Sequence, residues 1–227
     1  MGIEFDIRHV EEVASTNIEV KRAIDEKQYD GEPAKEGFGV CAKRQYAGVG
    51  RRGSTWQSPQ GGIYLSLLLN PQERKPLLTD DDLVSLSTVI AYAVYKALSK
   101  YVPKRLAIKR PNDIVVFEDL AGKKAANDKS AFKRPFKKLC GMMLEKHNGV
   151  ICVGIGINVI SPAEAIDIPT DEYIPCFLDR ESKFAGITVP GVLQSVLREI
   201  SACYELWLAQ GFAPFERDTE ERSFEAR

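Results

Sequence analysis

One short segment, residues 45–56, concentrates residue types that bind anions. Glycine lets the backbone adopt positive φ and lets a ligand approach the amides closely. Arginine presents a fixed fork of N–H donors that matches phosphate or carboxylate oxygens. The composition therefore predicts a loop that wraps a small anionic ligand, and a basic, solvated hairpin turn is the alternative interpretation. The residues concerned are Gln45, Gly48, Gly50, Arg51, Arg52, Gly53 and Trp56.

Two standard phosphate-binding motifs fail at this segment. The letters satisfy G-x-G-x-x-G, but a dinucleotide fold needs the third glycine to open a helix. Here Gly53 leads into residues 54–62, where Pro59 and two further glycines prevent a helix of useful length. Gly48 and Gly53 have the spacing of a Walker A loop, but such a loop needs lysine at the position of Ser54. The loop therefore requires another explanation.

Four other segments carry polar or glycine residues of the kind found in binding sites. Each is weak alone, because a Pro-Asn-Asp sequence between strands is usually only a turn and a strand glycine is usually a bulge. The segments are Ser15–Asn17, Lys109–Asp113, Lys138–Glu145 and Val153–Val159.

Taken together, in this order and at these spacings, the five segments resemble the catalytic domain of biotin protein ligases. The resemblance runs from about Ser15 to Asn158, with a weaker match at Gly211–Phe215. It implies an enzyme that activates biotin with Mg²⁺ and ATP, giving biotinyl-5′-adenylate and pyrophosphate. It also implies transfer of the biotinyl group to one lysine of a biotin carboxyl carrier domain in a biotin-dependent carboxylase, and the family's fold, which is similar to that of class II aminoacyl-tRNA synthetases.

The resemblance also implies roles for individual residues. Carboxylate and α-phosphate are both anions, so fixed cations are needed to bring them together. The implied catalytic cations are Lys138, Arg51 and Lys109. The implied biotin-binding residues are Ser15, Thr16, Asn17, Gln45, Gly48, Val49, Gly50, Arg51, Lys138 and Gly141. The implied adenylate- and ATP-binding residues are Arg51, Arg52, Trp56, Lys109, Asn112 and Asn158, and Asp113 is the implied Mg²⁺ ligand.

Structural interpretations and three departures from the family pattern leave alternatives open. Asp113 fits a turn residue, Trp56 a core residue, and Lys138 a solvated end of a basic run. The family usually has arginine where this chain has Val49, often a basic residue at Ser54, and tryptophan at the position of Arg110. A non-catalytic biotin-binding relative is therefore one alternative, and a lipoate or octanoate ligase or transferase of the same superfamily is another.

Hydrophobic periodicity predicts the elements that must position these residues. A Thr-x-x-Glu capping box at Thr16 predicts a helix start. Two more helices are expected at 80–101 and 192–208, strands at 38–42, 63–69, 106–109, 114–117, 139–145 and 150–156, and a polar insertion at 118–137. The pattern predicts an α+β fold: a mixed, largely antiparallel sheet with helices packed on one face.

Composition bounds the remaining possibilities. The 227 residues predict one catalytic domain over 1–215 and a tail over 216–227, without the family's N-terminal DNA-binding or C-terminal β-barrel domain. The net charge of −1 disfavours DNA binding through the basic run at 123–138. No signal peptide or membrane span is expected, and five scattered cysteines predict buried thiols in a reducing, cytoplasmic setting. The oligomeric state stays open, and a homodimer is compatible with the sequence.

Overall fold

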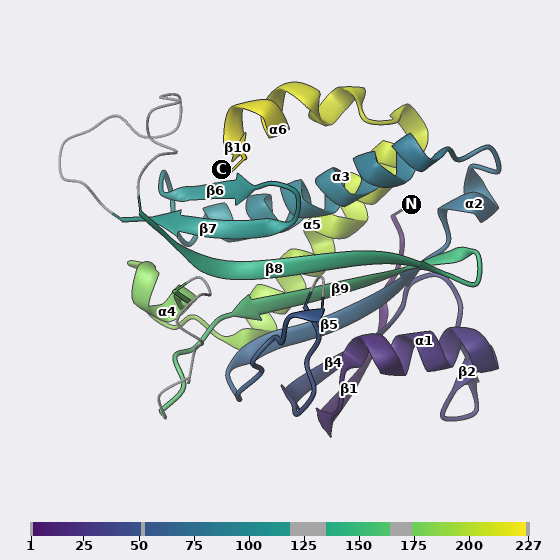
Figure 1. Ribbon diagram of the computed structural model, residues 1–227, viewed down its shortest axis with the longest axis horizontal. Helices are drawn as coiled ribbons and strands as arrows, with labels where there is room; N and C mark the ends of the chain where they lie inside the picture. Colours follow the sequence, from purple (N-terminus) through teal and green to yellow (C-terminus); the bar gives the residue numbers. More distant parts are fainter. Residues whose placement is uncertain (1, 51–52, 119–134, 164–173, 226–227) are drawn as a thin grey trace.

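The computed structural model describes residues 2–50, 53–118, 135–163 and 174–225. They form one eight-stranded sheet of order β1-β4-β5-β9-β8-β7-β6-β10, beside a small pair β2 (Gln28–Tyr29) and β3 (Glu32–Pro33) (Figure 1). The strands of the sheet are β1 Asp6–Val13, β4 Phe38–Gln45, β5 Gly62–Leu69, β6 Leu106–Lys109, β7 Asp113–Phe117, β8 Phe136–His147, β9 Val150–Asn158 and β10 Ser223–Phe224. The β1–β4 and β10–β6 pairs are parallel and all other pairs in this sheet are antiparallel, which confirms the predicted mixed, largely antiparallel α+β fold.

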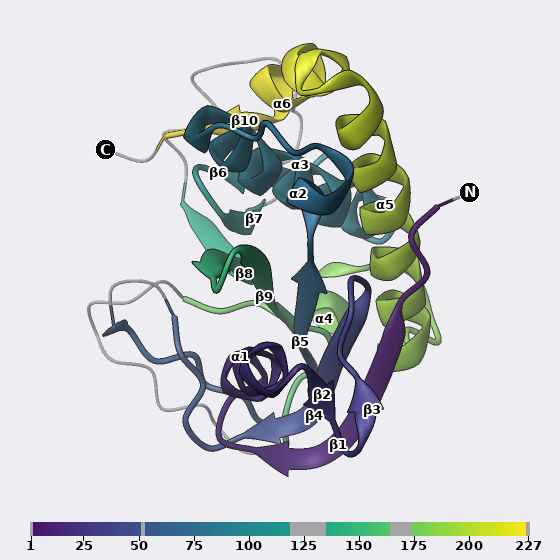
Figure 2. The ribbon, with the colours of Figure 1, turned by 90° about the vertical axis from the view of Figure 1, so that its right-hand side faces the viewer.

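Helices cover both faces of this sheet. The long helices α3 and α5 pack against each other and bury the main core on one face, whereas α1 lies on the opposite face, so the prediction of helices on one face holds for α3 and α5 and is wrong for α1 (Figure 2). Alternation along β5 makes the division visible, because Leu67 faces the main core and Leu68 faces α1. The helices are α1 Thr16–Glu26, α2 Pro71–Arg74, α3 Asp80–Ser99, α4 Leu178–Glu181, α5 Val189–Gln210 and α6 Glu216–Arg222, with a 3₁₀ turn at Ala213–Phe215.

Strand β5 is buried on both sides for its whole length. Two covered faces explain why its sequence is a continuous apolar run rather than an alternating one. The interruption is Ser66, which is fully buried within that run. A buried hydroxyl needs a hydrogen-bond partner, so Ser66 marks a polar position in the middle of the sheet.

Two of the helix starts that carry threonine differ in their capping. Helix α1 begins at Thr16 with Ser15 as its N-cap, but the Ser15 side chain makes no capping hydrogen bond, so the predicted capping box is wrong. Helix α3 has a complete capping box, in which Thr79 Oγ1 accepts from the Asp82 amide and the Asp82 carboxylate accepts from the Thr79 amide. The Thr16 side chain is bonded elsewhere, as described below.

The predicted boundaries fail at the insertion and at the tail. Strand β8 begins at Phe136, inside the predicted insertion, and residues 119–134 of that insertion lie outside the described residues. The predicted tail over 216–227 contains α6 and β10, and β10 adds an edge strand to the sheet.

The five cysteines are free and buried, as predicted. Burial raises the pKa of the Cys152 and Cys176 thiols to about 12, so these groups remain protonated and unreactive at neutral pH. No helix in the described ranges is long and apolar enough to cross a membrane.

Candidate functional site

A cluster of hydrogen-bonded polar side chains lies where the start of α1 meets the end of β4. The Thr16 amide and hydroxyl both donate to Gln45 Oε1, at 2.8 and 3.1 Å, and Gln45 Nε2 donates to Ser58 Oγ at 2.8 Å. The hydroxyl of Ser66 donates to Asn17 Oδ1 at 2.6 Å and lies 2.9 Å from Thr16 Oγ1. We call Thr16, Asn17, Gln45, Ser58 and Ser66 the polar cluster. Its bonds fix the orientation of both amide side chains.

Three predicted binding residues, Thr16, Asn17 and Gln45, thus come together, and Ser15 is buried beside them as the N-cap of α1. Sequence reasoning did not single out Ser58 or Ser66 as site residues. Ser66 could have been found from the sequence, because it is the one hydroxyl-bearing serine in an otherwise apolar strand. A buried hydroxyl needs a hydrogen-bond partner, so such a serine indicates a polar partner nearby.

A second layer supports Asn17 from the far side. The side-chain nitrogen Nδ2 of Asn17 lies 3.5 Å from Glu145 Oε2, and Lys21 Nζ is 2.8 Å from the same oxygen. Gly154 leaves the room that Asn17 needs, since a Cβ at this glycine would lie 2.7 Å from Asn17 Oδ1. The strand glycine is therefore required by a close approach rather than by a bulge.

We call residues 45–56 the glycine loop. Its described residues form a narrow hairpin next to the polar cluster. The Trp56 amide donates to the Gly48 carbonyl at 2.9 Å, and the Gly50 amide donates to the Ser54 carbonyl at 2.7 Å. A Cβ on Gly48 would lie 2.3 Å from the Trp56 carbonyl oxygen, so only glycine fits there. Val49 is about half exposed. The predicted contacts of Arg51 and Arg52 lie outside the described residues.

Trp56 lies over two glycines that face each other across β8 and β9. Gly141 and Gly156 are register partners, and a Cβ on either would lie within 2.8 Å of the indole. Lys138 Nζ is 5.2 Å from the centroid of a Trp56 ring, which is a cation–π distance. The indole Nε1 is buried and, within the described residues, has no hydrogen-bond partner. Trp56 is thus a wall of the site at Gly141 rather than part of the main core.

A charged cluster of Lys109, Asp113 and Lys138 lies next to Trp56. Asp113 is 6% exposed, its Oδ1 is 2.9 Å from Lys138 Nζ, and its Oδ2 is 3.5 Å from Lys109 Nζ. The side chains of Lys109 and Lys138 are 13% and 23% exposed. These three side chains together carry two ammonium groups and one carboxylate, partly shielded from water, and ammonium groups in such surroundings attract an anion.

Strand pairing explains how Lys109 and Asp113 meet the more distant Lys138. Lys109 and Asp113 are partners across the β6–β7 hairpin, and Asp113 is in turn the partner of Gly141 on β8. The register shifts between Ile114 and Val115, and a bulge of this kind re-aims the side chains beside it. Lys138 is consequently an ordered member of the site, and interpreting it as a solvated lysine is wrong.

The same contacts bear on the predicted magnesium site. Both oxygens of Asp113 are engaged by lysines, and the described part of the chain holds no group of three metal-ligating side chains. Asp113 therefore does not fit a magnesium ligand in this arrangement, and its contacts assign it to orienting the two lysines. Interpreting it as a turn residue also fails, because it is buried in β7.

Asn112 and Asn158, the two asparagines predicted to bind the adenylate or ATP, both contact the backbone of β8. Asn112 Nδ2 donates to the Met142 carbonyl, and the Met142 amide donates to the Asn112 carbonyl at 2.9 Å. Asn158 is 7% exposed, and its Nδ2 is 3.5 Å from the Lys138 carbonyl oxygen. Asn112 thus fastens the turn of the β6–β7 hairpin to the strand that bears Lys138.

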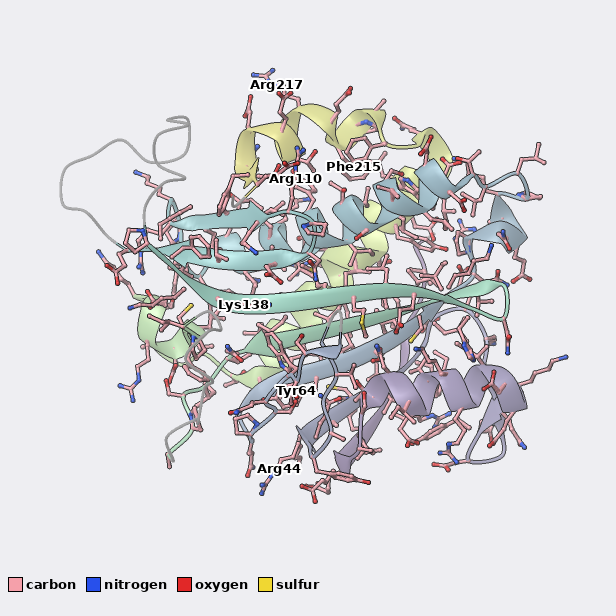
Figure 3. All side chains as sticks on the ribbon, in the orientation of Figure 1. Arg44, Tyr64, Arg110, Lys138, Phe215 and Arg217 are labelled. Carbon is pink, nitrogen blue, oxygen red and sulfur yellow. The ribbon has the colours of Figure 1, made fainter. Side chains whose placement is uncertain are left out.

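Arg110, at the position where the family usually has tryptophan, contacts β10. Its Nε donates to Ser223 Oγ at 2.8 Å, and its amide donates to the Phe224 carbonyl at 2.9 Å. Figure 3 shows Arg110 on the side of the hairpin that faces α6, away from Lys138. The charged cluster therefore does not include this arginine.

Comparison with known proteins decides the family. Residues 13–159 match the Biotin/lipoate A/B protein ligase family, and this stretch contains the polar cluster, the glycine loop and the charged cluster. The chain belongs to this family. As a Biotin/lipoate A/B protein ligase family member, it has the fold that its resemblance to biotin protein ligases implied.

Individual relatives agree with this placement. The chain is 31% identical over 186 residues to the Biotin--[acetyl-CoA-carboxylase] ligase of Paracoccus denitrificans, covering 77% of this chain and 66% of that protein. It is 31% identical over 192 residues to the Bifunctional ligase/repressor BirA of Bacillus subtilis, covering 81% and 50%. Among solved structures, biotin protein ligase from Aquifex aeolicus in complex with biotin and ATP matches with TM-score 0.71 and 26% identity, covering 96% of this chain and 78% of that one. The chain thus spans only about half to two-thirds of these curated relatives.

Proposed function

We propose that this family member is a biotin–protein ligase. It would join the carboxylate of biotin to the α-phosphate of ATP, and then pass the biotinyl group to a lysine of a biotin carboxyl carrier domain. The observation that carries the proposal is the charged cluster, which holds two lysines on one buried carboxylate beside a pre-oriented polar cluster. The two relatives named as ligases and the structural match to a biotin and ATP complex support the choice of substrates.

In the first step, a carboxylate oxygen of biotin attacks the α-phosphorus of ATP. A carboxyl–phosphate bond forms, and the bond from the α-phosphorus to the bridging oxygen breaks, so pyrophosphate leaves with that electron pair. Lys138 would bridge the two anions and reduce their repulsion, and Lys109 would stabilise charge on the phosphates. Asp113 keeps both ammonium groups in place before the ligand arrives.

Magnesium is a further expectation for this chemistry, and it would neutralise charge on the ATP phosphates when bound. Mg²⁺ usually keeps several waters and takes much of its coordination from substrate phosphates.

In the second step, the neutral amine of the carrier lysine attacks the acyl carbon of the adenylate. An amide bond forms, AMP leaves with the acyl–oxygen electron pair, and the amine loses one proton to solvent. No enzyme nucleophile is required, because positioning alone makes the attack effectively intramolecular. The glycine loop, with Arg51, would keep water from the adenylate, since a mixed anhydride hydrolyses readily.

The polar cluster would hold the uncharged ring end of biotin. Thr16, Asn17 and Gln45 supply donors and acceptors whose directions are fixed by one another. Such a cluster discriminates against a ligand that cannot pair with it, because buried polar groups left unpaired are unfavourable. Lipoate lacks a ureido group, which is why biotin is proposed as the substrate.

Pyrophosphate release tests the proposal. The chain is incubated with ATP and Mg²⁺ and either biotin or lipoate, and release is expected with biotin. Lys138→Ala should reduce the rate by about 10²- to 10³-fold, because it removes a cation aimed at the developing charge. Lys146→Ala, on an exposed position of the same strand, is the matched control and should leave the rate unchanged.

Each other outcome has a definite meaning. Release with lipoate alone would assign the chain to lipoate or octanoate transfer. Biotin binding without release from either acid would identify a non-catalytic relative. Release from Lys138→Ala at the unaltered rate would refute the role of the charged cluster.

A further inference from the structure

The segment that follows the 3₁₀ turn closes against the hairpin that bears Lys109. Strand β10 pairs in parallel with β6, with Ser223 opposite Ile108 and Phe224 opposite Lys109. Ser223 and Phe224 are both buried. This pairing makes β10 the neighbour of the strand that supplies one of the two site lysines.

An aromatic cluster anchors β10 in this position. The ring of Phe224 lies 5.6 Å from those of Phe117 and Phe136, centroid to centroid, and these two rings are 6.1 Å apart in an edge-on arrangement. Ring pairs at these distances contribute beyond the area they bury. The anchor is independent of the charged cluster, so a change at Ser223 need not release the strand.

Beyond the end of β6, β10 holds the next residue of the hairpin by two bonds. The Arg110 amide donates to the Phe224 carbonyl, and the Arg110 Nε donates to Ser223 Oγ. The Lys109 side chain, in contrast, lies next to Asp113 on β7, with its Nζ 3.5 Å from Asp113 Oδ2. Arg110 follows Lys109 directly in the chain, so fixing the backbone and side chain of Arg110 on β10 also restricts the backbone from which the Lys109 side chain extends toward Asp113.

The hairpin turn is thus held at both ends. Asn112 fastens it to β8, and Arg110 fastens it to β10. We propose that Ser223, acting through Arg110, is a positioning residue that holds Lys109 toward the ATP phosphates. Arg110 has this anchoring role in place of a direct contact with ATP. The inference rests on the proposed function, because it assumes that ATP binds beside Lys109.

The experiment measures the KM values for ATP and biotin separately in the full chain. Ser223→Ala removes the hydrogen bond between Arg110 and Ser223 and keeps the arginine charge, whereas Arg110→Ala removes the hydrogen bond and the charge together. Each should raise the KM for ATP about fivefold, the equivalent of one hydrogen bond, with the KM for biotin unchanged. The double variant should show no more than the larger single effect, since both changes break the same link. Ser223→Thr, which keeps the hydroxyl, should restore the KM for ATP.

Arg217→Ala supplies the control. Arg217 lies on α6, its side chain is 90% exposed, and its Nε pairs with Glu221 at 3.0 Å. It is an arginine of the same C-terminal segment that does not touch the hairpin in the described contacts, so its removal should change neither KM.

Several outcomes would overturn the inference. An unchanged KM for ATP in Ser223→Ala with a raised one in Arg110→Ala would show that the arginine acts by its own charge. A parallel rise of both KM values would show a general loss of folding instead of positioning. Additive effects in the double variant would show two separate roles.

A calorimetric titration with ATP alone separates this inference from the proposed function. Wild-type chain that releases no pyrophosphate with either acid would refute the ligase proposal. A weaker ATP affinity in Ser223→Ala than in wild type would still support the positioning role in such a chain. Equal ATP affinities would overturn it.

Discussion

At the scale of single residues, the site depends on places where no side chain is present. Gly141 and Gly156 lie side by side in the sheet and give Trp56 a flat surface of bare backbone. The indole in turn lies against Lys138, so its position affects where the ammonium group is held. A methyl group added at this surface should therefore disturb the site without altering any charged residue.

Gly156→Ala tests this dependence. Its Cβ would lie 2.6 Å from the indole Nε1, so Trp56 has to move. We expect biotin affinity to fall by roughly 5- to 150-fold, because overpacking of this kind costs roughly 1–3 kcal/mol. Equilibrium dialysis with labelled biotin measures the loss. Adding Trp56→Phe, a smaller ring, should recover part of it, and a double variant no better than Gly156→Ala would contradict the steric explanation.

The residue types of the site could be predicted from the sequence, but their partners could not. Lys138 and Asp113 were identified as separate residues with separate roles, a bridging cation and a metal ligand. Their 2.9 Å ion pair depends on the register of β7 and β8, including the shift after Ile114. No local pattern encodes a register set between strands that are separated by an insertion. Ser66 was not predicted as a site residue for a similar reason. Its partners Thr16 and Asn17 are about fifty residues away in the chain, so no local pattern connects them.

At the scale of elements, two helices that begin with a similar polar sequence have separate tasks. The Thr79 hydroxyl caps α3, whereas the Thr16 hydroxyl turns away from the backbone of α1 to Gln45 and Ser66. Helix α1 thus loses a local stabilising bond and gains a place in the polar cluster. Local propensity commonly yields in this way at functional sites.

Thr79→Ala should affect stability and leave catalysis alone. Loss of an N-cap hydroxyl lowers the free energy of unfolding by about 1 kcal/mol. Urea denaturation measures the change, and pyrophosphate release should stay at the wild-type rate. Val84→Ala, on an exposed position of the same helix, is the control and should shift the midpoint little. An unaltered midpoint in Thr79→Ala would contradict the capping role.

Most elements were predictable because their signals are local. The helix α3 and the strand β5 agree with the boundaries expected from their apolar patterns within a few residues. The side of the sheet on which α1 packs was not predicted, because the nearly continuous apolar run of β5 hides the difference between the face with Ser66 and Leu68, which α1 covers, and the face of the main core. The order in β10 was also missed, since a two-residue edge strand has no period of its own.

At the scale of the whole molecule, ionisable groups join α6 to α3, α5 to α2, and the start of α3 to the residues before it. The Tyr92 hydroxyl on α3 donates to the Asp218 carboxylate on α6, and this bond, with Arg222 nearby, holds the pKa of Asp218 below its usual value. A hydrogen-bonded pair with Arg74 lowers the pKa of Glu205 on α5, and bonds from Thr79 and Lys75 lower that of Asp82 on α3. These carboxylates therefore stabilise the folded state only while ionised.

Acid should weaken the fold accordingly. The folded-state pKa values are lower than those of the unfolded chain, so the unfolded chain binds more protons as the pH falls. The stabilisation is fully present above about pH 4.5 and is lost as the pH drops through the lowered values. Urea midpoints measured from pH 6 to pH 3 should show this decline. Tyr92→Phe should make the decline shallower, and an equal slope in both proteins would contradict a role for Asp218.

The pairing of β10 with β6 also has a consequence for the order in which the chain folds. Ser223 and its partner Ile108 are separated by 115 residues (223 − 108), whereas Lys109 and Asp113 are close in the chain. Contacts between such distant residues form late, because a long loop must first close. During synthesis the hairpin can fold well before residue 223 has been made. A nascent chain would therefore have its lysine–aspartate pair early and receive the outer support of that pair only later.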